Sequence, residues 1–281
     1  MTGGMVARGS APANLPAWDD APWTPLPPLE GDVTADVCVV GLGGSGLTAV
    51  AELRRRGARV VGLDAAHVGS GAAGRNGGLL LAGLAPFHHH AVRLVGRERA
   101  ARLYRLTIAE LERVAAEVPA LVRRTGSLRI AASAEELADC EAQRVALEAD
   151  GLPVERYAGP EGEGLLFPLD GVFHPLARCR ELARRAIAVG ARLHEGSHAD
   201  RVKGDTVETP RGRVRCARVI VAVDGRLEHV VPALHGRVRT ARLQMLATAP
   251  LSTIRWPRPV YRRWGYDYWQ QRADGCLLLG G

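Results

Sequence analysis

A glycine-rich turn near the N-terminus has the residue types and spacing needed to hold a phosphate group. Residues 41–46 read Gly-Leu-Gly-Gly-Ser-Gly, which matches the pattern G-x-G-x-x-G. In this pattern the first glycine permits a tight turn, the second lets the main chain approach a pyrophosphate, and the third lets a helix pack closely on a strand. The predicted phosphate-binding residues are Gly41, Gly43, Gly44, Ser45 and Gly46.

The segments around this turn give it the context of a dinucleotide site. An apolar, strand-like run at 35–41 precedes it, a helix-like segment at 45–56 follows, and a second strand-like run covers 58–64. That run ends at Asp64, whose carboxylate can accept hydrogen bonds from both ribose hydroxyls, and Ala65 follows it. An ordinary glycine-rich turn is the alternative, but strand, helix and strand together favour a parallel βαβ unit that binds a dinucleotide.

A second glycine-rich loop distinguishes between two cofactors. Residues 69–78 read Gly-Ser-Gly-Ala-Ala-Gly-Arg-Asn-Gly-Gly. NAD needs no such loop directly after the acidic residue, whereas a longer cofactor, FAD, would use one. The residues expected to reach its phosphates or flavin edge are Arg75, Asn76, Gly77 and Gly78. A flexible surface loop is the alternative interpretation.

The chain resembles the FAD-dependent oxidoreductases of the D-amino-acid oxidase family, in the branch of glycine oxidase and gamma-glutamylputrescine oxidase. Residues 36–65 and 71–78 carry the resemblance, and further matching segments lie at 171–193, 219–225 and 266–281. The family usually has serine where Ala73 stands and more often glutamate where Asp64 stands. The resemblance implies that FAD takes a hydride from the carbon beside the nitrogen of an amine or amino acid. Oxygen or another acceptor would then take up the electrons.

The resemblance also implies roles for residues outside the glycine loops. Val202 resembles a position whose main chain contacts adenine, although a buried strand valine would look the same. Gly225 follows a strand where the family has a turn against the cofactor. Three aromatic residues, Tyr266, Tyr268 and Trp269, lie where the family's sheet covers the flavin and lines the substrate pocket. The alternative for these aromatics is a core or interface patch. No catalytic side chain is assigned, because an amine that arrives neutral needs no base.

The predicted fold class is α/β, with an FAD/NAD(P)-binding Rossmann-like domain built on a parallel sheet and an α+β substrate domain built on an antiparallel sheet. The FAD-binding domain is expected at 31–90 and 169–236, and the substrate domain at 91–168 and 237–281. Residues 1–30 form an irregular lead-in whose tryptophans predict that it packs on the body as a strap. Helices are expected over 97–118, 134–149 and 175–190. Asp274 and Gly275 predict a hairpin turn, and residues 65–86 read as a loop.

Family members continue past the strand that ends this sequence, so we expect a C-terminal segment to be missing. In the family that segment adds a helix whose N-terminus lies by the flavin. Leu277–Leu279 would then form an unpaired sheet edge, and the chain would bind FAD weakly. An FAD-binding fragment without turnover is therefore one alternative function.

The amino-acid composition bears on which other functional classes and which cellular compartment suit the protein. The chain has 37 basic and 30 acidic side chains, for a net charge of +7, but the arginines are spread along the sequence. Nucleic-acid binding is therefore not favoured, and a flavoprotein acting on modified tRNA remains the second alternative. Five cysteines without a C-x-x-C pair suit a reducing cytoplasm. No apolar run is long enough to span a membrane.

Three adjacent histidines, His88, His89 and His90, invite a metal-binding hypothesis. Three neighbours in sequence cannot all point at one ion, and no carboxylate or cysteine is near them in the sequence. We therefore expect a solvated start of a helix at these histidines and no metal.

Overall fold

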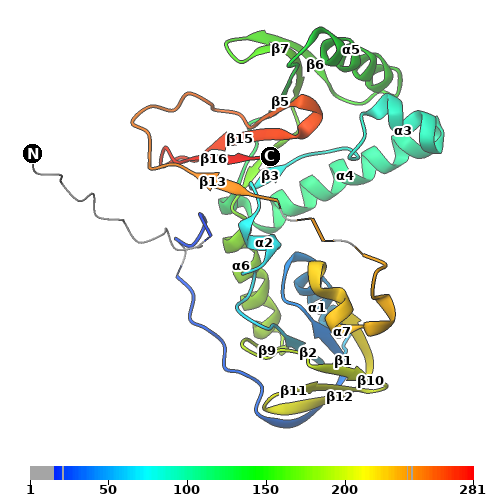
Figure 1. Ribbon diagram of the computed structural model, residues 1–281, viewed down its shortest axis with the longest axis vertical. Coiled ribbons are helices and arrows are strands. Elements are labelled where there is room, and N and C mark those ends of the chain that lie inside the picture. Colours follow the sequence, from blue (N-terminus) through cyan, green and yellow to red (C-terminus); the bar gives the residue numbers. More distant parts are fainter. Residues whose placement is uncertain (1–15, 21, 239, 242) are drawn as a thin grey trace, which may run out of the picture.

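The computed structural model describes residues 16–281 except residues 21, 239 and 242. Figure 1 shows two halves, each built on a sheet. The lower half carries α1, α6 and α7 with one sheet, and the upper half carries α3, α4 and α5 with another. The predicted α/β class is confirmed, because a mainly parallel sheet and a mainly antiparallel sheet occur in the same chain.

The lower sheet has six strands in the order β10-β11-β12-β1-β2-β9. Strands β12, β1, β2 and β9 run parallel, while β10, β11 and β12 form an antiparallel meander. The bounds are β1 Gly31–Val40, β2 Val60–Leu63, β9 Arg192–His194, β10 Arg201–Lys203, β11 Thr206–Thr209 and β12 Gly212–Val221. The apolar runs around the first glycine turn become β1 and β2, which confirms the predicted parallel βαβ unit.

Helices α1 (Gly44–Arg55) and α6 (Pro175–Ala188) pack against each other and against this sheet. Their contact forms a core cluster whose members are almost fully buried, among them Val39, Leu47, Val60, Leu182 and Leu193. The predicted proline at the start of the 175–190 helix is found at its first position. Short helices in this half are α2 Ala72–Arg75, α7 Leu227–Val230, and the 3-10 turns η2 Asp224–Arg226 and η3 Pro232–Leu234.

The upper sheet has seven strands in the order β13-β16-β15-β14-β5-β7-β6. Neighbouring strands are antiparallel except β14 and β5, which are parallel. The bounds are β5 Ser127–Ile130, β6 Glu155–Gly159, β7 Gly162–Phe167, β13 Met245–Ala247, β14 Val260–Arg262, β15 Asp267–Gln271 and β16 Leu277–Gly280. The predicted hairpin at Asp274 joins β15 to β16. The expectation that Leu277–Leu279 is an unpaired edge is wrong, because β13 pairs with β16 on its other side.

Three helices accompany this sheet: α3 (His88–Val95), α4 (Arg97–Glu117) and α5 (Ala134–Ala149). Ser133 caps α5 as predicted, because its hydroxyl oxygen accepts a hydrogen bond from Glu136 N at 3.2 Å. The 3-10 turns here are η1 Pro119–Leu121 and η4 Arg263–Gly265.

A small three-stranded sheet, β3-β8-β4, joins residues from distant parts of the sequence. Its strands are β3 Leu79–Leu80, β4 Val122–Arg123 and β8 Gly171–Phe173. The expectation of an uninterrupted loop over 65–86 is therefore wrong, since this segment contains both α2 and β3. The proposed domain boundary at residue 90 also falls inside α3, which packs on α4 and α5.

The described part of the lead-in forms the predicted strap. Trp18 is buried, and its indole nitrogen donates to Asn76 O at 2.8 Å. Trp23 Nε1 donates to Glu195 Oε1 at 2.9 Å, and Leu26 N donates to Glu195 Oε2 at 2.8 Å. The strap therefore ties the second glycine loop to the segment after β9.

None of the helices in the described ranges is both long enough and apolar enough to cross a membrane.

Candidate functional site

The first glycine turn lies between β1 and α1, with Gly41 and Gly46 fixed by their own surroundings. Gly41 has a φ of +100°, and a Cβ there would clash with Ala222 O at the end of β12. A Cβ on Gly46 would clash with Gly41 O. Glycine at these two positions is therefore required by the turn and by close helix–strand packing.

Gly43 differs, because a Cβ there would meet a side chain and not the main chain. Among the described residues, the one atom within 4 Å of such a Cβ is Ala73 Cβ, at a tight 3.3 Å. Gly43 precedes α1, whose N-terminus has no capping side chain and no acidic residue in its first turn. The main-chain N–H groups at Gly44 and Ser45 belong to this uncapped turn, where the helix dipole favours an anion. The residues therefore fit a phosphate-bearing cofactor.

Asp64 closes the other side of this turn. Its carboxyl oxygens accept hydrogen bonds from Leu42 N at 2.8 Å and Ala66 N at 2.9 Å. Burial raises the pKa of Asp64 above its ordinary value, while these two main-chain donors act in the opposite direction. Each oxygen keeps a further lone pair, so the side chain can hold the turn and still accept from a ligand. Ala65, beside it, is exposed.

Two further residues predicted to contact the cofactor, Gly225 and Val202, belong to the same half of the fold as the first turn. Gly225 lies in η2, three residues after Ala222, and Thr240 Oγ1 donates to its carbonyl at 2.7 Å. Val202 lies on β10 and is partly buried against a core cluster that includes Val207 and Val214. Core packing alone is enough to account for a valine at this position. A contact between Val202 and adenine therefore stays a prediction.

The second glycine loop contains the helix α2 and is held by its own side chains. Arg75 Nε donates to Ser70 O at 2.7 Å. Asn76 Nδ2 donates to Ala73 O at 2.8 Å, and Asn76 Oδ1 accepts from Gly78 N at 2.9 Å. Asn76 thus closes α2 and fixes the turn that follows. The predicted role of these residues at a cofactor stays a prediction.

Gly77 joins this loop to the upper sheet. A Cβ on Gly77 would lie 3.1 Å from the Tyr268 ring, and Gln270 Nε2 donates to Gly77 O. The structure therefore brings β15 directly against the second glycine loop.

The three aromatic residues predicted for the substrate pocket lie in different surroundings. Tyr268 faces Gly77, stacks on Tyr261 with 5.5 Å between ring centroids, and donates from its hydroxyl to Met245 Sδ at 3.2 Å. Trp269 points to the opposite face and packs in the core with Leu128 and Val260. Tyr266 is 70% exposed. Of the three, Tyr268 lies against the second glycine loop, and a role for it in a substrate pocket stays a prediction.

A cavity of about 410 Å³ opens beside this aromatic pair. Its wall is formed by the segment 81–86, by α4, by strands β5 and β14, and by η4. The residues that line it include Tyr104, Ser127, Arg129, Asp170, Tyr261 and Trp264. The volume suits a small organic molecule.

Asp170 is the acidic group of this cavity. It is buried, accepts from Ser127 Oγ at 2.6 Å and from Ala82 N at 2.9 Å. Burial raises its pKa to about 6, and the hydrogen bonds and the Arg129 charge lower it in part. Burial likewise raises the pKa of Tyr261 to about 12. At neutral pH the Tyr261 hydroxyl is therefore protonated, while Asp170 lies close to its titration range.

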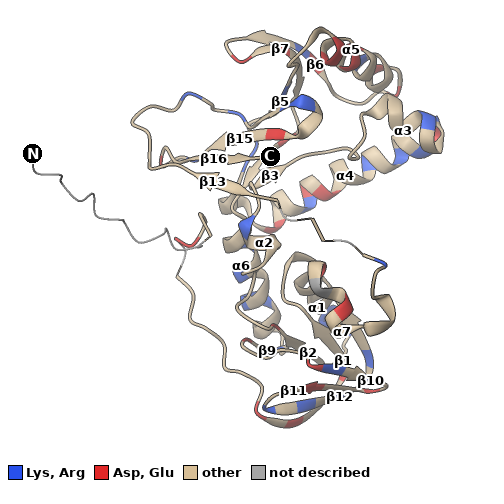
Figure 2. Cartoon of the chain, viewed as in Figure 1, with Lys and Arg blue, Asp and Glu red and all other residues tan. Residues whose placement is uncertain are grey.

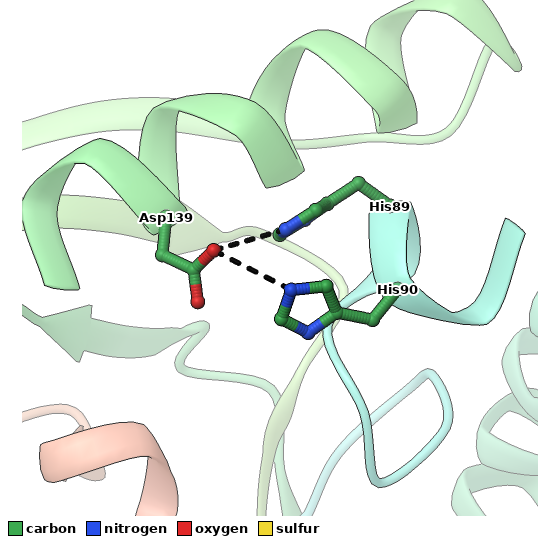
Figure 3. A group of neighbouring side chains, drawn as sticks. All are labelled: His89, His90 and Asp139. Atoms are coloured by element: carbon green, nitrogen blue, oxygen red, sulfur yellow. Dashed lines mark hydrogen bonds and ion pairs between the residues drawn. The ribbon is translucent and has the colours of Figure 1, made fainter. Parts of the chain in front are cut away.

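The three adjacent histidines do not form the solvated helix start that was expected. His88 is 2% exposed, and its Nε2 lies 2.7 Å from Asp150 Oδ2. His89 Nε2 and His90 Nε2 both approach Asp139 Oδ1, at 3.0 and 3.6 Å (Figure 3). Asp139 and Asp150 come from α5, about 50 residues further along the chain, which is why no carboxylate was evident near the histidines in sequence.

Asp139 also fixes a wall of the cavity. Its Oδ2 accepts from Trp264 Nε1 at 2.9 Å, and Trp264 N donates to Glu136 Oε1 at 2.6 Å. Trp264 has a φ of +53°, which is unfavourable for a bulky residue. Two buried or half-buried carboxyl groups of α5 therefore hold η4 in a strained conformation at the cavity.

Sequence reasoning missed two charged groups that organise this region, the half-buried Arg129 and the buried Glu195. Glu195 accepts from Trp23, Leu26 and Val68, the last at 2.6 Å, and so joins the strap to the loop after β2. A charged residue inside an apolar strand, such as Arg129 between Leu128 and Ile130, was the available signal.

Many charged residues on the helices form ion pairs. Figure 2 shows basic and acidic residues interspersed along α4. Arginine–glutamate pairs three or four residues apart occur on α1, α4, α5 and α6, such as Arg113 with Glu110 at 2.6 Å. The excess of arginine therefore does not gather into a basic face on these helices.

The sequence is similar to that of known oxidoreductases over most of its length. A protein-family profile, DAO, described as FAD dependent oxidoreductase, matches residues 36–281. The probable oxidoreductase OrdL of Haemophilus influenzae is 26% identical over 91% of this chain and 66% of its own length. The gamma-glutamylputrescine oxidoreductase of Escherichia coli is 28% identical over 92% of this chain and 67% of its own length. The chain thus spans about two thirds of the length of these relatives.

Solved structures share the fold. A glycine oxidase from Geobacillus kaustophilus superposes with a TM-score of 0.69 at 19% identity, covering 88% of this chain and 70% of that one. An L-proline dehydrogenase from P. horikoshii gives 0.66 at 19% identity, covering 90% and 70%. At such identities the likeness establishes the arrangement of elements.

Proposed function

The chain belongs to the DAO family of FAD-dependent oxidoreductases, and we propose that it binds FAD and oxidises a C–N bond of a small amine or amino acid. One observation carries this proposal: the uncapped N-terminus of α1, where a Cβ on Gly43 would meet only the Ala73 side chain. The main chain requires glycine at 41 and 46 without a ligand, but it does not require glycine at 43. A pyrophosphate approaching the main chain does.

The residues proposed to hold FAD come from both glycine loops. The turn at 41–46 would bind the pyrophosphate and Asp64 the ribose, with Ala65, Val202 and Gly225 beside them. Arg75, Asn76, Gly77 and Gly78 would line the part of the cofactor nearest the upper sheet. FAD, when bound, supplies the acceptor for the hydride that leaves the substrate. The chain's own residues bind and orient both molecules.

On the substrate side, Tyr268 and Tyr261 form an aromatic wall between the second glycine loop and the cavity. Their stacked rings exclude water and can hold an apolar or cationic substrate against the loop. No side-chain base is assigned, since an amine that arrives neutral can lose a hydride without one. Oxygen or another small acceptor would take the electrons onward.

The names of the relatives suggest which substrates to test first. They are named for glycine, L-proline and gamma-glutamylputrescine, each of which carries a primary or secondary amine. We infer a substrate of this class. Five free, buried cysteines support a reducing location such as the cytoplasm.

The experiment is to purify the protein with added FAD and to mix it anaerobically with these amines. Bleaching of the flavin absorbance by at least one amine is the expected result. Tyr268→Ala should raise KM or lower turnover while the flavin-to-protein ratio stays unchanged, and Tyr266→Ala, at the exposed ring, is the matched control. Bound flavin that no amine bleaches would favour an FAD-binding protein without turnover. Failure to bind flavin at all would overturn the proposal.

A further inference from the structure

Arg129 is a half-buried cation at the wall of the cavity. Its guanidinium lies over the Phe87 ring, 4.2 Å from the centroid, and 5.8 Å from that of Phe167. Among the residues that the structure describes, no carboxyl group forms an ion pair with it, and its Nε is buried without a hydrogen-bond partner. Arginine stays charged in proteins. Removing such a charge from water without a partner is costly, so its position needs an explanation.

The nearest carboxyl group on the cavity wall, Asp170, attracts the Arg129 charge but forms no ion pair with it. The Asp170 oxygens already accept hydrogen bonds from Ser127 and Ala82. The aromatic rings stabilise the cation from its faces, but they leave its buried Nε–H without an acceptor. The cavity itself is the remaining place from which an acceptor can come.

Strand register places Arg129 in one row with the aromatic wall. Tyr261 lies opposite Tyr268 on β15 and opposite Arg129 on β5. Residues directly opposite each other on neighbouring strands share a face of the sheet. The row therefore runs from Tyr268, against Gly77, through Tyr261 to Arg129. Two strand spacings separate its ends, or about 10 Å.

We propose that Arg129 binds a carboxylate at the far end of the substrate, so that the substrate is an elongated amine with an acidic terminus. This inference rests on the proposed function, with the reacting amine held near Tyr268 and the second glycine loop. The planar fork of the guanidinium matches a carboxylate through two parallel hydrogen bonds. A spacing of about 10 Å is reached by an extended chain of roughly seven bonds, so the acid is not attached to the reacting carbon.

A binding test separates this inference from turnover. Hexanoate and hexanamide have the same length and cannot be oxidised at an amine, and they differ in charge at one end. Binding is followed by the fluorescence of Trp264, which lines the cavity, and by calorimetry, in FAD-loaded protein. Wild type should bind hexanoate at least tenfold more tightly than hexanamide. Arg129→Met should abolish this preference, and Arg129→Lys should retain part of it.

Arg156→Met is the matched control, because Arg156 continues the same row beyond Leu165 but is 70% exposed and paired with Glu141. It should leave the preference intact. Arg129→Met should also leave the melting temperature unchanged or higher, since it removes a half-buried charge that forms no ion pair with the described residues. A merely structural arginine would give a clear loss of stability and no change in ligand preference.

Turnover gives the second readout. With 6-aminohexanoate, Arg129→Met should lower kcat/KM by on the order of 100-fold, mostly through KM, whereas 6-aminohexanamide should be turned over equally by variant and wild type. Equal binding of hexanoate and hexanamide to wild type would overturn the inference. If no amine reduces the flavin but the hexanoate preference depends on Arg129, the proposed oxidation fails while the carboxylate site stands.

Discussion

At the scale of single residues, the two ends of the first glycine turn and its centre have different reasons to be glycine. Gly46 is required by the fold, because a Cβ there meets Gly41 O, whereas a Cβ on Gly43 meets only the Ala73 side chain, at 3.3 Å. Gly43→Val should therefore fold with a modest loss of stability, as Ala73 is displaced, and lose at least 100-fold in FAD affinity. Flavin absorbance per protein and circular dichroism measure the two properties.

Gly46→Ala serves as the contrasting variant. It should lower the melting temperature, because the helix must move away from the turn. Stoichiometric FAD in Gly43→Val would mean that the pyrophosphate does not lie on this turn.

Asp170 should make stability depend on pH. Its unfolded carboxyl titrates near 3.8 and its folded one at about 6. Folding therefore takes up a proton between these values, and the stabilisation is present below pH 3.8 and lost as pH rises through 6. Relative to Asp170→Asn, wild type should lose about 2 kcal/mol of unfolding free energy between pH 4 and pH 7. Denaturant unfolding at several pH values measures this difference.

Asp200→Asn, at an exposed carboxyl group, is the control for Asp170. Parallel pH profiles of Asp170→Asn and wild type would show that Asp170 is not protonated in this range.

At the scale of elements, the strap depends on one buried side chain. The Glu195 carboxylate accepts hydrogen bonds from Trp23 Nε1, Leu26 N and Val68 N. It therefore connects the lead-in to the loop that follows Asp64. Glu195→Gln keeps the size of the side chain but replaces one acceptor oxygen by a donor, which then faces N–H groups. We expect a loss of about 2–4 kcal/mol and faster proteolysis within residues 16–30.

Glu208→Gln, at a partly exposed residue of β11, is the comparison for the strap. Equal cleavage rates in the two variants would contradict a role for Glu195 in holding the lead-in.

At the scale of the whole molecule, bound FAD should stabilise the fold, because both glycine loops would contact one ligand. A free FAD concentration 100-fold above its Kd should add about 2.7 kcal/mol and raise the melting temperature by several degrees. Calorimetric scans at increasing FAD measure the shift, and Gly43→Val should show none. An FAD-loaded protein whose melting temperature equals that of the flavin-free form would contradict this expectation.

Local patterns in the sequence were enough to predict the βαβ unit of the first half of the fold. The alternation of apolar strand, glycine turn and helix determines the βαβ unit around Gly41 and Asp64, since each signal lies within a few residues of the structure it forms. The cap at Ser133, the proline start of α6 and the hairpin at Asp274 are local in the same sense. All of them are found where they were expected.

The arrangement of the upper half of the molecule depends on contacts between residues that are distant in sequence. β16 lies between β13 and β15, and this pairing with a strand some 30 residues earlier is why the expected unpaired edge is absent. The histidines at 88–90 meet Asp139 and Asp150 only because α3 packs on α5.

The sequence by itself therefore determined the dinucleotide-binding frame, and the tertiary structure decided which side chains face the cavity. That Tyr268 faces the second glycine loop while Trp269 packs in the core depends on where β15 begins, because side chains alternate along a strand. Arg129 joins Tyr261 and Tyr268 through strand register across more than 130 residues of chain. Register is a property of strand pairing, and no short stretch of sequence contains it.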